Sequence, residues 1–459
     1  MGMGVGLSCR KKYIKEHNKM KRFFVIIIVV FFLTGCLFDF PEKYELEFGE
    51  TEITTSEYTD TSAPTATITE TAEPAETEPV YVHPHERFDL NRLSLALSDT
   101  SQITEDLEII SNRYRATGMS VAVFVNGEII YTFNHGFSDK GANIKTNDDT
   151  KYRVSSLSKT VTAVCAMMLV DSGELDLDRT VSDIMGFDMD IYHDTPNTTR
   201  HLLTHTSNII HCKAYEDAFT YRPPLTIPQM LERGIWSADI PGSRYNYSNF
   251  GAALVGAVIE SITNERFYRY ADDNLFSRLN MDAGYLRTLI TDTDNIANIY
   301  KEGELEFSVK TWGRTESLYN GIPLGQSYGL SECELIISAS DLAKIGIMLS
   351  GDGSVDGVQI LSQESVDLMN TVYITTQNKA GYIIGQGLQL RIYDYLMDGR
   401  VISGHPGQAL GTVGGLYFDP ADGTGVAILT NGCDLYSEDN GLYSINNDVL
   451  FKVYAHFFN

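Results

Sequence analysis

A long polar stretch near the N-terminus limits where this chain can fold. Residues 37–82 are rich in Thr, Glu, Ala and Pro and show no apolar period; TSAPTATITETAEPAETEP is the clearest part. Such a stretch buries too little apolar surface to offset the conformational entropy lost on ordering. We therefore predict a disordered acidic tether over residues 36–82 and one folded domain over residues 83–459.

The residues before the tether have the pattern of an export signal. A basic run ends at Arg22, and residues 23–33 are all apolar, a length that is short for a membrane-spanning helix. Leu33-Thr34-Gly35-Cys36 then resembles the lipobox of bacterial lipoproteins, whose cysteine receives a lipid. We expect residues 1–35 to be a signal peptide and Cys36 to anchor the protein to a bacterial membrane, facing outside the cytoplasm. The alternative is an uncleaved anchor helix.

Charge and cysteine spacing exclude two classes of partner. The formal net charge is −26 at pH 7, whereas nucleic-acid binding needs a basic surface. The cysteines after Cys36 are scattered without a C-x-x-C pair, which argues against a zinc site. Cys165 lies among apolar residues and is predicted to be in the core, and a disulfide between two of the other three stays open.

The folded part has strand patterns at both ends and helical patterns between them. Residues 119–134 predict a β-hairpin that turns at Asn126-Gly127. We also predict two internal helices, three late strands and a terminal amphipathic helix. The ranges are, in order, 154–172 and 247–261; 401–404, 412–418 and 425–430; and a helix with Ile445, Val449, Leu450, Val453 and Phe457 on one face. This order predicts an α+β fold, with an antiparallel sheet flanked by helices and a second, mostly helical lobe.

Ser156 and Lys159 give the strongest chemical signal. A serine hydroxyl is a poor nucleophile without a base, and a lysine three residues later on a helix lies on the same face. The start of a helix also favours developing negative charge. Alone the S-x-x-K pattern is weak, because Ser156 could equally cap the helix while Lys159 faces solvent.

Two later motifs strengthen this hypothesis. Tyr247-Ser248-Asn249 opens an apolar helical segment, and His405-Pro406-Gly407 follows a short apolar strand. Tyrosine can act as a general base beside cations, and an asparagine amide can both donate and accept a hydrogen bond. A glycine lets the backbone approach a ligand closely. Three motifs in this order are much more specific than any one of them.

The three motifs also carry a family resemblance. YRVSSLSKTVTA, PGSRYNYSNFGAALVGAVIE and SGHPGQALGTVGG resemble the signatures of the serine β-lactamase and penicillin-binding protein superfamily, nearest its class C β-lactamase branch. The resemblance extends from about residue 90 to the end. It implies that Ser156 is acylated, that Lys159 and Tyr247 share proton transfer, and that Asn249 helps to hold the substrate amide and Lys159.

The resemblance also implies how the substrate lies. His405 and Gly407 would mark the strand along which it binds, and the backbone N–H groups of Ser156 and Gln408 would form the oxyanion hole. We therefore expect a serine hydrolase that needs neither metal nor organic cofactor and cleaves small ester, amide or peptide substrates, β-lactams and D-amino-acid peptides included. The alternatives are a penicillin-binding D,D-peptidase acting on the cell wall and a penicillin-recognising receptor without turnover.

Two residues depart from the family pattern, Pro406 and Asn208. Pro406 replaces the hydroxyl residue of the third motif. His405 stays within the pattern, which has lysine or histidine there, but histidine has an ordinary pKa of ~6.5 and carries little charge at pH 7. Because a neutral His405 and the missing hydroxyl both weaken recognition of a substrate carboxylate, we expect simple esters or neutral D-amino-acid amides to be preferred over penicillins. Asn208 replaces the glycine of HTSG, and asparagine tolerates a left-handed backbone there.

Other candidate sites are weaker. Ser327 lies in a G-x-S-x-G pattern, but no apolar strand precedes it as an α/β-hydrolase nucleophile requires. His201, His205 and His211, like His83 and His85, lack a clustered acid or H-E-x-x-H pattern. We expect all five histidines to be structural or surface residues rather than metal ligands.

Overall fold

The structure is a computed structural model that describes residues 89–189, 194–218, 224–309 and 315–458. The signal peptide, Cys36, the tether, His83 and His85 lie outside the described residues. No helix in the described part of the chain has the length and apolarity that crossing a membrane requires.

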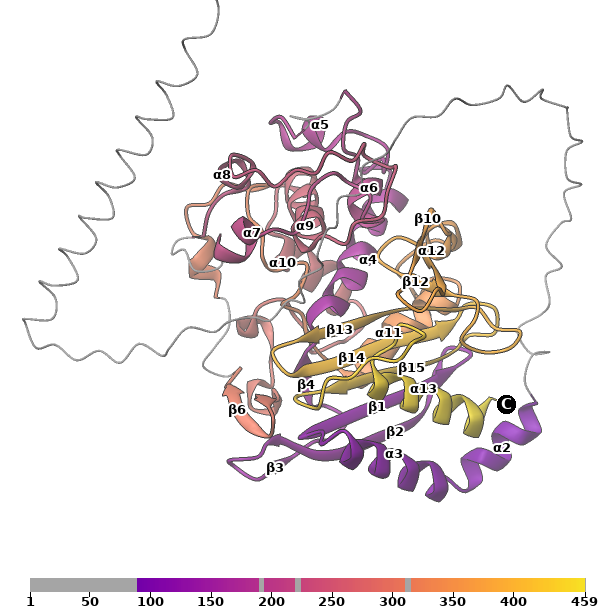
Figure 1. Cartoon of the computed structure of the whole chain (residues 1–459). Coiled ribbons are helices and arrows are strands. Elements are labelled where there is room, and N and C mark those ends of the chain that lie inside the picture. The colour runs from indigo at the N-terminus through magenta and orange to yellow at the C-terminus, as the bar shows by residue number, and fades with distance from the viewer. Residues whose placement is uncertain (1–88, 190–193, 219–223, 310–314, 459) are drawn as a thin grey trace, which may run out of the picture. The chain divides into compact units, whose positions relative to one another are not determined.

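Nine antiparallel strands form one sheet, in the order β10-β11-β12-β13-β14-β15-β1-β2-β3 (Figure 1). Strands from the two ends of the chain meet inside it, since β1 pairs with β15 and Ala122 lies opposite Ala427. The prediction of one sheet built from distant segments is confirmed. The bounds are β1 Gly118–Val125, β2 Glu128–Asp139, β3 Ile144–Lys145, β10 Ile374–Gln377, β11 Ile383–Gln386, β12 Arg391–Tyr393, β13 Ile402–Ala409, β14 Thr412–Asp419 and β15 Thr424–Thr430.

The predicted β-hairpin is present and turns where expected. Asn126 and Gly127 both have positive φ, 51° and 86°. Two positive φ values in a two-residue loop match the twist of the flanking strands, which is why Asn-Gly is favoured there.

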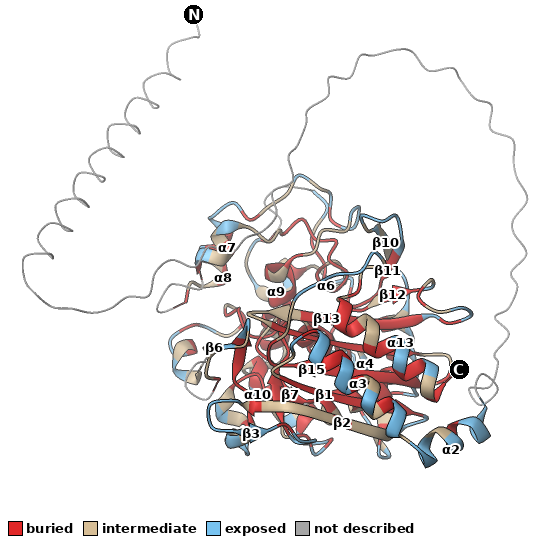
Figure 2. Cartoon of the chain, turned by 60° about the horizontal axis from the view of Figure 1, so that its bottom comes forward, coloured by how far each residue is buried: buried red, intermediate tan, exposed pale blue. Residues whose placement is uncertain are grey.

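Helices cover both faces of the sheet. The helices α3 (Ser101–Arg113) and α13 (Ser444–Phe457) pack on one face, and α11 (Ala339–Ser350) packs on the other. Figure 2 shows the central strands buried and the outer sides of α3 and α13 exposed. The apolar stripe predicted for the terminal helix is buried as expected: Ile445, Val449, Leu450, Val453 and Phe457. Burying a side chain of this size contributes about 1.5–3 kcal/mol.

A mostly helical lobe lies beside the sheet, as predicted (Figure 1). Its helices are α5 Val181–Met185, α6 Thr199–Leu203, α7 Lys213–Ala218, α8 Ile227–Leu231, α9 Asn249–Thr263 and α10 Phe267–Ala271. The remaining elements are α2 Leu90–Ser98, α4 Ser158–Asp171, α12 Gln363–Asn370, β4 Lys151–Arg153, β5 Ile299–Lys301, β6 Glu304–Phe307, β7 Ile336–Ser338, β8 Ser354–Val355 and β9 Val358–Gln359. Cys165 on α4 is buried as predicted, and neither Cys212 nor Cys433 forms a disulfide within the described residues.

Candidate active site

Ser156 lies in a single 3-10 turn, Ser155–Leu157, between β4 and α4. Ser155 has φ 52°, a left-handed conformation that costs a non-glycine residue on the order of 1–3 kcal/mol. Arg153 steadies this turn, because it donates to Ser155 Oγ at 3.4 Å while it pairs with the buried Glu334 at 3.1 Å. Neither the turn nor α4 has a side-chain N-cap, so the interpretation of Ser156 as a helix cap is wrong.

The predicted nucleophile and its two predicted partners come together. Lys159 Nζ donates to Ser156 Oγ at 3.1 Å, and the Tyr247 hydroxyl donates to the same oxygen at 2.9 Å. Lys159 reaches it from the next turn of helix, whereas Tyr247 comes from the segment that precedes α9. The serine oxygen therefore lies within proton-transfer distance of two groups that can act as acid or base.

Lys159 is buried, with 1% of its surface exposed. Its second hydrogen bond goes to the backbone carbonyl oxygen of Glu332, at 2.8 Å. The resemblance implied that Asn249 helps to hold Lys159. In the structure, Asn249 Nδ2 instead lies 3.3 Å from His211 Nδ1. Glu332 is a positioning residue that sequence reasoning missed, because it acts through its backbone and no motif marks it.

The ring of Tyr247 lies near the amine of Lys159 and the ring of His205. Lys159 Nζ is 5.3 Å from the centroid of its ring, and the His205 ring is 4.4 Å away on centroids. Burial, helped by the charges of Lys159 and Arg391, lowers the pKa of His205 to about 3. His205 is therefore uncharged, and its Nδ1 accepts a hydrogen bond from the Ser248 amide at 3.3 Å.

One edge of β13 is open next to this cluster. The pairing of β12 with β13 stops at Gly404, and no described strand follows the edge beyond it. Val413 of β14 directs both its N–H and its C=O at Thr430, on the β15 side. Gln408 of β13 lies opposite Val413 in the β13–β14 pair. Its N–H therefore points away from β14 and toward the open edge. This orientation is the one that the predicted oxyanion role needs.

Pro406 fits the sheet for the same reason. It lies two residues before Gln408, so its missing N–H would also have faced the open edge. No ladder hydrogen bond to β14 is lost, which is the condition under which a strand tolerates proline.

Gly407 lies very close to the catalytic turn. A Cβ at this position would lie 2.3 Å from the Val154 carbonyl oxygen and 3.2 Å from Leu157 Cγ. Close approach to the turn that carries Ser156 therefore requires glycine here, and the expected approach to a ligand stays a prediction. The approach to the turn brings the Gln408 backbone beside the nucleophile.

His405 is neutral, as predicted, but the site does contain a cation near it. Burial, then the charges of Arg391 and Lys159, hold the pKa of His405 well below its ordinary value. Its Nδ1 donates to the Pro406 carbonyl at 2.6 Å. Arg391 of β12, opposite Gly404, forms no ion pair with any carboxylate in the described part of the chain. Sequence reasoning missed it, although an arginine within the mostly apolar segment LQLRIY was a usable signal.

The remaining sequence candidates have structural roles. Ser327 Oγ donates to the buried Glu260 at 3.0 Å, in an irregular segment rather than a strand-to-helix turn. The left-handed residue of the HTSN segment is His205, with φ 54°, so the expectation for Asn208 is wrong. Asn208 Oδ1 instead accepts from Asn197 at 2.9 Å. His201 closes a capping box at the start of α6.

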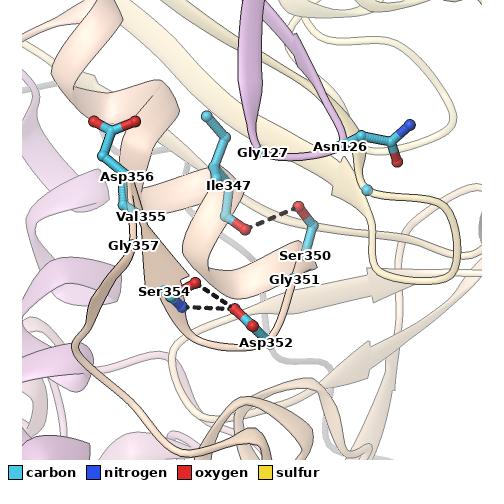
Figure 3. Close-up of a pocket in the computed structure, with 11 residues that line it drawn as sticks. Asn126, Gly127, Ile347, Ser350, Gly351, Asp352, Ser354, Val355, Asp356 and Gly357 are labelled. Atoms are coloured by element: carbon cyan, nitrogen blue, oxygen red, sulfur yellow. Dashed lines mark hydrogen bonds between the residues drawn. The ribbon is translucent and has the colours of Figure 1, made fainter.

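The pocket in Figure 3 lies apart from these residues. It has a volume of about 370 Å³ and is lined by the Asn126-Gly127 turn, the end of α11 and β8. Asp352, one of its acids, already accepts two hydrogen bonds from Ser354, at 3.0 and 2.6 Å. None of its lining residues belongs to the three motifs.

Comparison with known proteins agrees with this geometry. Penicillin-binding protein 4 of Amycolatopsis lactamdurans is 26% identical over 346 residues, which cover 73% of this chain and 86% of that protein. A class C β-lactamase structure superposes with a TM-score of 0.60 at 20% identity, covering 82% of this chain and 98% of that one. EstCE1, a hydrolase with promiscuous acyltransferase activity, gives 0.57 at 20% identity, covering 79% and 99%. The two structures show a shared fold.

A family model identifies the family as well as the fold. The model described as Beta-lactamase matches residues 100–443, a span that contains Ser156, Tyr247 and His405 with all their contacts described above. Because the match covers most of the chain, this protein belongs to the Beta-lactamase family.

Proposed function

We propose that this protein is a serine hydrolase that cleaves ester or amide bonds through an acyl-enzyme on Ser156. One observation carries the proposal: Lys159 Nζ and the Tyr247 hydroxyl both lie within 3.1 Å of Ser156 Oγ, next to the open edge of β13. A structural serine does not need two proton carriers on one oxygen.

The geometry supports a two-step reaction. Ser156 Oγ attacks the substrate carbonyl carbon while its proton passes to the Tyr247–Lys159 pair. The N–H groups of Ser156 and Gln408 stabilise the negative oxygen that forms. The pair then protonates the leaving oxygen or nitrogen as its bond to the carbonyl carbon breaks. Water then attacks the resulting ester while the pair takes one of its protons. The bond between Ser156 Oγ and the carbonyl carbon breaks, the pair passes that proton to Oγ, and the carboxylic acid leaves.

Arg391 favours one narrower activity, that of a D,D-peptidase or β-lactamase. Penicillins and D-alanyl-D-alanine ends both carry a carboxylate. The Arg391 guanidinium interacts with the hydroxyls of Tyr245 and Tyr393 but has no carboxylate partner in the described part of the chain, so it is suited to bind one. The sequence-based expectation of a preference for neutral esters assumed a site without such a cation. We therefore place carboxylate-bearing acyl donors ahead of neutral esters.

Labelling of the nucleophile tests the proposal. A fluorophosphonate should modify the wild-type protein and Ser327→Ala but not Ser156→Ala; the reverse pattern would refute it. The mass of the intact protein, followed after brief exposure to penicillin, then distinguishes a hydrolase from a receptor that is acylated but does not turn over. A penicilloyl adduct that disappears within minutes supports a hydrolase, and one that persists for hours supports the non-turnover receptor.

We also propose that the protein is anchored by a lipid on Cys36 at the outer side of the bacterial cell membrane. The lipobox-like segment before Cys36 and the polar tether after it support this location. Metabolic labelling with a fatty acid should be lost in Cys36→Ala and kept in Cys9→Ala. Labelling that persists in Cys36→Ala would exclude the anchor.

A further inference from the structure

Two hydrogen bonds to His205 hold the backbone on either side of Tyr247. The carbonyl oxygen of His205 accepts from the Asn246 N–H at 2.8 Å, and its ring nitrogen Nδ1 accepts from the Ser248 N–H at 3.3 Å. The ring itself lies 4.4 Å from the ring of Tyr247 on centroids. One residue of the helical lobe therefore contacts the tyrosine through its ring and through both neighbouring peptides.

The Ser248 contact determines which nitrogen of His205 carries the proton. A backbone N–H only donates, so Nδ1 must carry a lone pair and the proton of the neutral ring must be on Nε2. The titratable and charged side chains around the ring are, by element, Lys159 of α4, Tyr245 and Tyr247 ahead of α9, Arg391 of β12 and His405 of β13. None of these five is a carboxylate that could stabilise an imidazolium.

Gln389, in the turn between β11 and β12, lies at the Nε2 end of the ring. Its own Nε2 donates to the Leu202 carbonyl oxygen at 3.2 Å, so its Oε1 is the end that interacts with His205. His205 Nε2 and Gln389 Oε1 are both buried, and neither has another partner in the described part of the chain. The backbone oxygen of Gln389 also accepts from the Thr160 hydroxyl at 2.9 Å, one residue after Lys159. Gln389 therefore connects His205 to the helix that carries the lysine.

We propose that His205 is the positioning residue of Tyr247, and that Gln389 holds the His205 ring in the orientation that this requires. The inference rests on the proposed hydrolase function and extends it to two residues that form no hydrogen bond with Ser156. Without an acceptor at Nδ1, the buried Ser248 N–H would lack its partner, and the peptide next to Tyr247 would be free to turn. The tyrosine hydroxyl would then move from its place 2.9 Å from Ser156 Oγ.

A double-mutant cycle distinguishes positioning from general damage. Glycine tolerates the φ of 54° at this position, so His205→Gly removes the ring without backbone strain. It should slow acylation by p-nitrophenyl acetate on the order of 10²-fold, the usual effect of a displacement of about 1 Å. In the Tyr247→Phe background the same change should alter the rate no more than about twofold, because the hydroxyl that it displaces is already absent. Equal factors in both backgrounds would indicate a purely structural role and overturn the inference.

A rescue variant and a matched histidine identify the contact that matters. Asparagine places an acceptor oxygen close to the position of Nδ1 and tolerates a left-handed backbone, so His205→Asn should keep most of the acylation rate. His201 is the control, because its Nδ1 also accepts a backbone N–H, that of Thr198 at 3.2 Å, at the start of α6. His201→Ala should leave acylation unchanged. The inference fails if His205→Asn is as slow as His205→Gly, or if His201→Ala is equally slow.

The pH profile of acylation tests the part assigned to Gln389. Gln389→Glu places a carboxylate at the Nε2 end of the ring, which favours the imidazolium and so competes with the bond from Ser248. This variant should lose activity at an acidic pH at which the wild type keeps it. The combined variant with His205→Asn should not, because asparagine does not titrate. The same acid loss with and without His205 would show that Gln389 does not act through the ring.

Fluorophosphonate labelling keeps the two proposals apart. If Ser156 of the wild type takes no label and no ester is hydrolysed, the hydrolase function itself fails. If the wild type is labelled and active but the cycle with Tyr247 is additive, only the positioning role of His205 fails.

Discussion

The backbone carbonyl oxygen of Glu332 accepts a hydrogen bond from Lys159 Nζ at 2.8 Å, and this contact directs the buried amine at Ser156 Oγ. Neither partner atom of Nζ belongs to a carboxylate, and Lys159 forms no ion pair in the described part of the chain. The arrangement places the amine where it can exchange a proton with Ser156 Oγ, which the Tyr247 hydroxyl also contacts.

Tyr247→Phe should remove proton transfer while keeping the packing of the ring on His205. We expect acylation to slow by ~10²–10⁴-fold, the usual contribution of general acid–base catalysis. Stopped-flow release of p-nitrophenol from p-nitrophenyl acetate measures this step. Tyr245→Phe is the control, because its hydroxyl makes no hydrogen bond to Ser156. Equal rates in the two variants would show that Tyr247 is not the proton carrier.

Arg391→Gln should lower kcat/KM only for substrates that carry a carboxylate. A charge-assisted hydrogen bond contributes about 1.5–3 kcal/mol, so kcat/KM for a cephalosporin should fall about 10–100-fold. The methyl ester of the same cephalosporin should lose little, because it has no negative charge to lose. Similar losses for the acid and its ester would contradict carboxylate binding by Arg391.

Local patterns explain how much of this site could be predicted. Ser156 and Lys159 are a helical turn apart, and Asn126-Gly127 can form only a few turns, so the sequence near each residue contains the information. Arg391 is different, because its place depends on where the pairing of β12 with β13 stops. That register is set by the whole sheet and is not visible in a short segment.

The HTSN segment shows the same limit. Asparagine is a good left-handed residue, so Asn208 was a reasonable choice on intrinsic preference. In the fold, buried contacts override that preference: Asn197 holds Asn208, and His205 takes the left-handed conformation. Gly407 was marked correctly as a site of close approach, but its partner, Val154, is some 250 residues away in sequence and could not be inferred.

Two buried neutral histidines should make the protein sensitive to acid. In the unfolded chain a histidine binds its proton near pH ~6.5, whereas folding lowers the pKa of His205 to about 3 and that of His405 well below its ordinary value. Between these values the unfolded state binds more protons, so the free energy of unfolding falls as the pH falls, by up to ~1.4 kcal/mol per pH unit for each histidine.

His205→Asn tests this linkage, because asparagine tolerates the left-handed backbone at that position. Urea denaturation at pH 7 and pH 5 should show the variant losing about 2 kcal/mol less than the wild type over this interval. An equal loss in both proteins would mean that His205 does not carry the acid sensitivity.

Gly407→Ala should damage catalysis more than folding. The new Cβ would lie 2.3 Å from the Val154 carbonyl oxygen, so β13 and the turn that carries Ser156 must separate. Overpacking of this kind costs about 1–3 kcal/mol of stability. The separation also moves the Gln408 N–H away from the developing oxyanion, and loss of one such donor typically lowers kcat about 10²–10³-fold.

Gly141→Ala is the control, because its Cβ would meet nothing nearer than 3.5 Å and Gly141 lies outside the motifs. Thermal unfolding and ester hydrolysis measured on both variants should show an intact, slightly less stable Gly407→Ala protein with little activity. Wild-type activity in that protein would mean that the Gln408 amide is not part of the oxyanion hole.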